Sequence, residues 1–266
     1  MLQAMNLSKT FDGSTALNEL NCTVPTGAIY GVVGSNGAGK STFLRLLAGI
    51  YRPDNGRATL NGVDIYECVQ AKEQIVLVPD ELYFLPQATL QRMAALYHRS
   101  FPHFSLDHFN ALVQLFQLNP TKPIRTFSKG MKRQAAIILA LAAKPRYLLL
   151  DEAFDGLDPL MRDVVRRILV HDVVARETTI VISSHSLREL EDTCDWLALL
   201  HRGTLVLEST KTALIEQAPN GLEALFVERL NQVGYTFDDA LATLYAQQSV
   251  QARAETQEGM QEVTVA

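Results

Sequence analysis

The feature that most constrains this chain is a glycine-rich segment, Gly34-Ser35-Asn36-Gly37-Ala38-Gly39-Lys40-Ser41. It fits the pattern G-x-x-x-x-G-K-[ST], in which glycines let successive backbone N–H groups wrap around phosphate oxygens. The apolar run before it predicts a strand, and residues 42–48 predict a helix, which is the context that the pattern requires. A glycine-rich turn is the alternative interpretation. The flanking elements favour a phosphate-binding loop in an α/β domain.

The side chains of this loop have distinct expected roles. Lys40 is expected to neutralise the β- and γ-phosphates of a nucleotide, and the Ser41 hydroxyl to bind Mg²⁺. The predicted nucleotide-binding residues of the segment are Gly34, Ser35, Asn36, Gly37, Ala38, Gly39, Lys40, Ser41 and Thr42.

Short apolar runs alternate with amphipathic stretches, which predicts strands wrapped by helices. Strands are expected at residues 28–33, 74–78, 147–150 and 179–183, and polar residues follow each of them. Ligands of open parallel sheets bind beyond the carboxyl ends of the strands, so the polar residues are expected to share one site. Residues 80–146 are rich in helical patterning and are interpreted as a helical subdomain.

Turn and capping residues predict several element boundaries. Ser105 is expected to cap a helix over residues 106–118, and Asp158 followed by Pro159 to start another. Residues 186–189, Ser-Leu-Arg-Glu, fit a capping box. A hairpin is expected over residues 196–207, followed by helices and a polar tail from about Gln247.

Two carboxylates, Asp151 and Glu152, end the apolar run at residues 147–150. Burial explains the run but not the acidic pair. Asp151 is suited to hold Mg²⁺, directly or through water, and Glu152 to accept a proton from a water attacking the γ-phosphate. Acidic residues also commonly end strands, so the pair gains weight chiefly from the phosphate loop that precedes it.

Three further elements give the chain a resemblance to the ATP-binding cassette (ABC) family. Residues 127–131, Phe-Ser-Lys-Gly-Met, resemble the signature LSGGQ, residues 156–158 resemble the D-loop, and His185 resembles the switch histidine. The resemblance covers about residues 1–210 and rests on the order and spacing of the elements. It implies an ABC-type nucleotide-binding domain of the P-loop NTPase class over 1–210, with a helical extension and tail at 211–266.

The resemblance also implies a mechanism. Two cassettes would pair head to tail, and Ser128, Gly130 and Asp158 of one copy would complete the ATP site of the other. His185 would bind the γ-phosphate. Phe11 would stack on adenine, although a phenylalanine of the core is the competing interpretation.

The chain departs from the family pattern at several positions. Asp80 stands where a glutamine is usual, and we hypothesise that its carboxylate binds Mg²⁺ instead. Lys129 and Met131 replace a glycine and a glutamine of the signature, and residues 153–154, Ala-Phe, replace the usual Pro-Thr.

The remaining features concern the setting of the protein. A net charge of −5 argues against broad nucleic-acid binding, and three scattered cysteines indicate neither disulfides nor a zinc site. No apolar run reaches the roughly 20 residues that span a bilayer. The expectation is a cytoplasmic subunit of a bacterial export-type transporter, at the inner face of the membrane, with separate membrane-spanning subunits docking near residues 81–85. Soluble cassettes acting on ribosomes or DNA are the alternative, and small P-loop kinases or GTPases explain fewer of the motifs.

Overall fold

The computed structural model describes residues 1–234 of the chain. The chain divides into two compact units, one over Met1–Pro219 and one that begins at Asn220, and each is described by itself. The polar tail predicted from about Gln247 lies outside the described residues.

A six-stranded sheet forms the centre of the first unit, in the order β10-β9-β3-β8-β7-β6. Strands β3, β6, β7, β8 and β9 are parallel, and β10 pairs antiparallel with β9. All four predicted strands are confirmed to within one residue at each end. The predicted hairpin is also confirmed as β9 and β10, and it extends three residues beyond the predicted end, to Thr210. The bounds are β3 Ile29–Val33, β6 Ile75–Val78, β7 Tyr147–Asp151, β8 Thr179–Ser184, β9 Trp196–His201 and β10 Thr204–Thr210.

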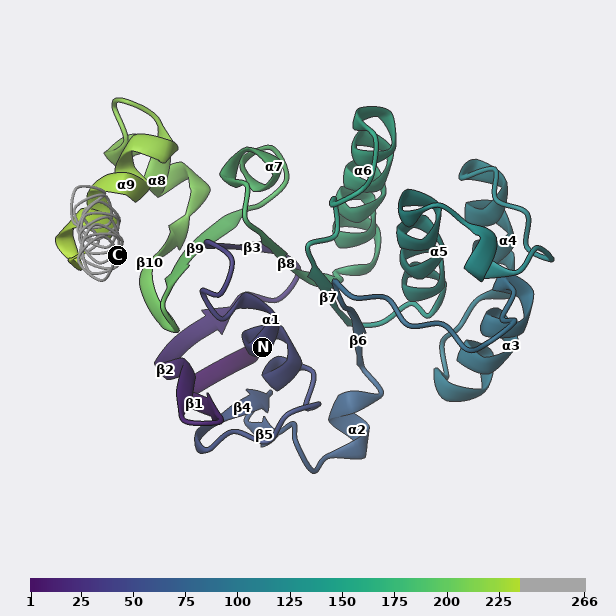
Figure 1. The fold of residues 1–266 in the computed structure, drawn as a ribbon, viewed down its shortest axis with the longest axis horizontal. Helices are drawn as coiled ribbons and strands as arrows, with labels where there is room; N and C mark the ends of the chain where they lie inside the picture. The colour runs from purple at the N-terminus through teal and green to yellow at the C-terminus, as the bar shows by residue number, and fades with distance from the viewer. Residues whose placement is uncertain (235–266) are drawn as a thin grey trace, which may run out of the picture. The chain divides into compact units, whose positions relative to one another are not determined.

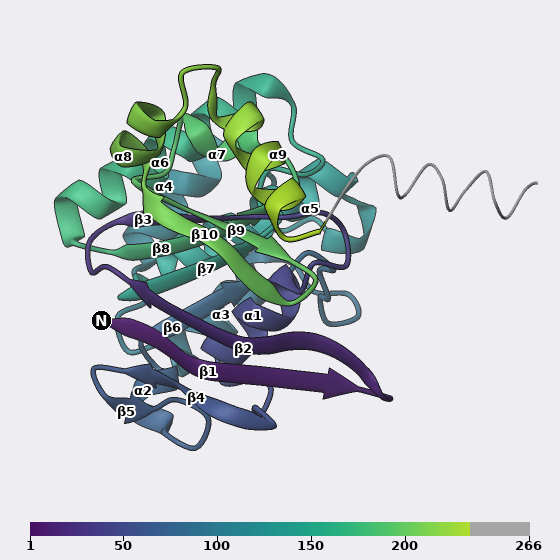
Figure 2. The same ribbon diagram turned by 90° about the vertical axis from the view of Figure 1, so that its left-hand side faces the viewer.

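A second, antiparallel sheet was not predicted from the sequence (Figure 2). Its order is β2-β1-β4-β5, and in β2 buried residues alternate with exposed ones because one face packs on the core. Leu7 and Leu17 join Phe43 and Leu44 in the hydrophobic core beneath this sheet. The bounds are β1 Leu2–Phe11, β2 Ser14–Val24, β4 Asn55–Leu60 and β5 Val63–Asp64, with α1 at Lys40–Leu47 and α2 at Val69–Lys72.

The predicted helical subdomain is confirmed between β6 and β7, where α3, α4 and α5 lie together (Figure 1). Helix α3 spans Leu90–Ser100, α4 spans Leu106–Leu115 and α5 spans Lys129–Ala142, preceded by a 3₁₀ turn at Ile124–Thr126. The Ser105 hydroxyl accepts a hydrogen bond from the His108 N–H, as a cap should. The helix ends earlier than predicted, because Gln117 adopts a left-handed conformation.

Two helices follow the strands β7 and β8. Asp158 caps α6, Pro159–Arg176, as predicted, by accepting from the Met161 N–H. The capping box predicted at α7, Leu187–Glu191, is wrong, because the Ser186 side chain makes no cap bond. Glu189 instead accepts from the Ser184 hydroxyl and pairs with Arg162.

The predicted helices after the hairpin are also present. Helix α8 covers Lys211–Gln217 at the end of the first unit, and α9 covers Leu222–Gln232 in the second.

Candidate active site

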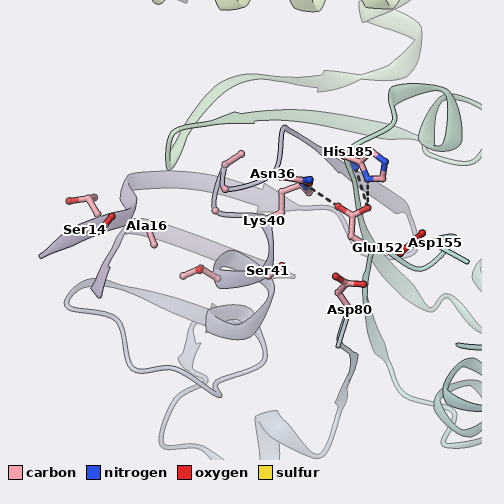
Figure 3. A pocket seen from close by; sticks show the side chains of 14 residues that line it. Ser14, Ala16, Asn36, Lys40, Ser41, Asp80, Glu152, Asp155 and His185 are labelled. Atoms are coloured by element: carbon pink, nitrogen blue, oxygen red, sulfur yellow. Dashed lines mark hydrogen bonds and ion pairs between the residues drawn. The ribbon is translucent and has the colours of Figure 1, made fainter. Parts of the chain in front are cut away.

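A pocket of about 500 Å³ lies at the carboxyl ends of the parallel strands (Figure 3). Its walls come from the start of β2, the loop before α1 together with the first turn of α1, and the segments that follow β6, β7 and β8. The lining residues are Ser14, Thr15, Ala16, Asn36, Gly37, Ala38, Gly39, Lys40, Ser41, Thr42, Asp80, Glu152, Asp155 and His185. The structure therefore brings the predicted loop, Glu152, Asp80 and His185 into one site.

The loop between β3 and α1 needs glycine at its last turn. Gly39 has φ 105°, and a Cβ atom there would lie 2.5 Å from the carbonyl oxygen of Ala16. Only glycine satisfies both the positive φ and the close backbone approach. The turn directs the N-terminus of α1 at the pocket, where its free N–H groups favour an anion.

The Lys40 side chain is held inside the site at 6% exposure. Its ammonium donates to the carbonyl oxygens of Gly34 at 2.7 Å and Ser35 at 3.1 Å. It also pairs with the Glu152 carboxylate at 3.2 Å. Gly34 and Ser35 thus orient the lysine through their carbonyl groups rather than lining the pocket.

Glu152 stands at the centre of the polar contacts in the site. Its Oε1 faces Lys40, and its Oε2 lies 3.0 Å from His185 Nδ1, as the dashed lines in Figure 3 mark. Its backbone has φ 49°, which is uncommon for a residue with a side chain and typical of functional sites. The turn points the carboxylate into the pocket, while residues 153–154 (Ala-Phe) are buried beneath it.

Asp151 is almost fully buried at 1% exposure and does not line the pocket. The Ser183 hydroxyl donates to its Oδ1 at 2.6 Å and accepts from the Glu152 N–H at 3.1 Å. One hydroxyl therefore fixes both members of the acidic pair. Sequence reasoning missed Ser183, although parallel pairing of the two predicted strands places it opposite Asp151.

Two further charged side chains of the site were not predicted. Arg133 is buried at 1% exposure and donates to the Asp80 carboxylate at 2.8 Å. Asp155 lines the pocket and pairs with Lys129 at 2.6 Å. The hydrogen bond from Lys129 lowers the pKa of the Asp155 carboxyl.

The remaining predicted residues lie outside this pocket. Ser128 caps α5 by accepting from the Met131 N–H, and neither it nor Gly130 nor Asp158 lines the pocket. Phe11 ends β1 and is 38% exposed, with its ring edge-on to Tyr51 at 5.3 Å between centroids. Its stacking on adenine stays a prediction.

A phosphate loop at the edge of a parallel sheet, with a lysine, a glutamate and a histidine converging on the pocket beside it, defines a P-loop nucleoside triphosphatase. Comparison with known proteins narrows the class. Residues 17–155 match the family described as ABC transporter. The chain belongs to this family, and it is an ATP-binding and ATP-hydrolysing subunit of the transporter type.

Individual relatives agree with this assignment. The ABC transporter ATP-binding protein YtrB of Bacillus subtilis is 34% identical, over 77% of this chain and 70% of the relative. The Nod factor export ATP-binding protein I of Burkholderia lata is 33% identical, over 79% and 71%. A solved structure of an ATP-binding subunit of an ABC transporter superposes with a TM-score of 0.79 at 26% identity, covering 86% of this chain and 99% of that one.

Proposed function

We propose that this chain powers export of a substrate through separate membrane-spanning subunits, from a position at the inner face of the cell membrane. The observation that carries the proposal is the convergence of Lys40, Glu152 and His185 on one pocket. None of the helices between Met1 and Gly234 has the length and hydropathy that a bilayer-spanning helix needs. The direction rests on the name of the Nod factor export relative. The named relatives are transporter proteins, and no feature of the site favours the ribosome or DNA alternative.

The chemistry that we assign to the pocket follows from its contacts. Lys40 binds the β- and γ-phosphates, because its ammonium is fixed beside the N-terminus of α1. Glu152 accepts a proton from the attacking water, since its carboxylate lines the pocket beside Lys40. His185 donates a hydrogen bond to the γ-phosphate, since it lines the pocket next to Glu152.

The donor set of the pocket fits a magnesium ion that arrives with the nucleotide. Within residues 1–234 no group of three or more His, Cys, Asp or Glu side chains is placed to hold a metal alone. Mg²⁺ in nucleotide sites keeps several waters, so the protein needs to supply only one or two oxygen ligands. The Ser41 hydroxyl and the free oxygen of Asp80 would hold the ion directly, and the buried Asp151 would act through water. The ion would neutralise phosphate charge.

A second copy of a cassette would complete each site. Ser128 and Gly130 stand at the start of the 14-residue helix α5, where N–H groups favour an anion. They and Asp158 do not line their own chain's pocket, which supports a role toward the nucleotide of a partner cassette. Head-to-tail pairing would bring the two together.

The segment Glu81–Leu85 is the proposed docking site for the membrane-spanning subunits. Its residues alternate, with Leu82 and Phe84 half-buried while Tyr83 is 80% and Leu85 53% exposed. A depression between the start of α3 and the segment at residues 121–125 is lined by Arg92 and Arg125 and by no acidic side chain. A short partner helix with an apolar face and a carboxylate would complement both features.

The function is tested by purification from detergent-solubilised membranes. The bait is Glu152→Gln, which we expect to retain ATP-bound dimers because it lacks the proposed base, and the matched control is Glu152→Gln combined with Tyr83→Asp. Recovery of a polytopic membrane protein by the first bait and its loss with the second supports the proposal. Recovery of ribosomes or DNA instead would contradict it.

A further inference from the structure

Helix α5 carries two basic side chains one turn apart, Lys129 and Arg133, and each pairs with an acid that borders the nucleotide pocket. Lys129 Nζ lies 2.6 Å from Asp155 Oδ2, and Arg133 Nη2 lies 2.8 Å from Asp80 Oδ1. Both acids line the pocket. Residues four apart lie on the same helix face, so this face of α5 is fastened to two separate loops of the site.

In the second pair the Arg133 guanidinium is buried, whereas the Asp80 side chain is 44% exposed. The guanidinium also donates to the carbonyl oxygens of Pro79 at 2.8 Å and Asp80 at 2.9 Å, directly after β6. A buried guanidinium without a carboxylate is costly, so Asp80 is held as its counter-ion. The pair fixes α5 to the end of the strand on which the pocket is built.

The Lys129 pair is reinforced by close backbone contact. A Cβ atom at Gly130 would lie 2.6 Å from the Gly156 carbonyl oxygen, and one at Gly156 would lie 3.4 Å from the Lys129 stem. The first turn of α5 therefore lies directly against the loop that follows Glu152. The ammonium group closes this contact by binding Asp155.

We propose that Lys129 and Arg133 are positioning residues that hold the turn Ser128–Gly130 in a fixed place relative to the chain's own pocket. This rests on the proposed function, in which that turn closes the nucleotide site of a partner cassette. The two ion pairs act as struts between the half-site that the chain uses itself and the half-site that it offers to its partner.

A different role for Lys129 makes opposite predictions. If its ammonium acted directly on the partner's phosphate, Asp155 would compete for it, and Asp155→Asn would leave turnover unchanged or raise it. If the pair is a strut, Asp155→Asn and Lys129→Met lower turnover equally, and the double variant is no worse than either.

The test compares steady-state ATP hydrolysis by the full-length protein and by Lys129→Met, Asp155→Asn and the double variant. The Lys129 side chain is 71% and the Asp155 side chain 41% exposed, so folding is not at risk. We expect kcat to fall about fivefold in all three, as for an exposed pair, with KM for ATP changed by less than about twofold. Lys132→Met is the control, because Lys132 lies on the same helix and makes no ion pair within residues 1–234.

The results distinguish a failure of the strut proposal from a failure of the proposed function. Parent-like or faster turnover in Asp155→Asn, or a double variant much slower than both singles, overturns the strut. Absence of Lys40-dependent hydrolysis in the parent would instead defeat the proposed function. For the second pair, Asp80→Asn is expected to lower kcat even at saturating Mg²⁺, because it removes the Arg133 ion pair as well as the proposed metal ligand. Parent-like kcat at saturating Mg²⁺ would overturn the strut at this position.

Discussion

Replacement of Glu152 by glutamine removes the negative charge that pairs with Lys40. The two groups lie 3.2 Å apart, and their side chains are 12% and 6% exposed. A nucleotide phosphate must take the ammonium away from this carboxylate before it binds. The pair therefore stabilises the nucleotide-free protein and opposes nucleotide binding by the same free energy.

The size of this free energy follows from the geometry. At an effective dielectric constant of about 20, two charges at that separation attract by about 5 kcal/mol, and desolvation offsets much of this. Charged hydrogen bonds contribute about 1.5–3 kcal/mol net, so we take about 2 kcal/mol. Glu152→Gln should then bind ADP about 30-fold more tightly. Its nucleotide-free form should melt about 4–8 °C lower.

The assay is titration of a fluorescent ADP analogue without divalent cations, together with thermal unfolding with and without ADP. Asp155→Asn is the matched control, since it removes a pocket carboxylate that does not contact Lys40. Its ADP affinity should change less than about threefold. Parent-like affinity and melting in Glu152→Gln, or an equal gain in the control, would refute the reasoning.

Three other properties can be tested directly. Burial raises the pKa of the Cys22 thiol to about 12 and also raises the pKa of the Cys194 thiol, whereas Cys68 is partly exposed. A thiol reagent at pH 8 should therefore modify only Cys68 rapidly in the native protein, with one equivalent of reagent consumed per chain. Burial lowers the pKa of His108 in the folded protein. Below about pH 6.5 the unfolded chain therefore binds more protons than the folded protein, and the free energy of unfolding falls by up to about 1.4 kcal/mol per pH unit. Between pH 7.5 and 5.5 the melting temperature of His108→Gln should fall less than that of the parent, and an equal fall would contradict this. Gly39→Ala puts a Cβ atom 2.5 Å from the backbone oxygen of Ala16, at a residue with φ 105°. It should weaken nucleotide binding at least about tenfold in a titration and lower the free energy of unfolding by about 2 kcal/mol in a denaturation experiment. Parent-like values in both would show that the loop adapts.

The sequence predicts the parallel strands and the pocket because their signals are local. The run before Asp151 and the loop ending at Lys40 each carry a pattern that needs no knowledge of distant residues. Parallel pairing then brings the strand ends together at one edge. This is why Lys40, Glu152 and His185 converge as expected.

The features missed by sequence reasoning depend on pairs far apart in the chain. The antiparallel sheet joins Leu2 to Leu60, and Arg133 meets Asp80 across 53 positions. Neither contact leaves a periodic or capping signal. The capping box at Ser186 failed for a related reason, because Glu189 is engaged by Arg162 from another helix. Tertiary charge pairing overrode the local pattern there.

The absence of a side chain at Gly130 also limits which segments can be exchanged between related cassettes. Its backbone leaves no room for even a methyl group beside the carbonyl of Gly156, so the segments around Gly130 and Gly156 must be complementary in shape. A chimera that grafts residues 127–133 from a relative should fold and turn over well only when residues 154–158 come from the same donor. Any exchange of segments between related cassettes at this contact must therefore replace both segments together.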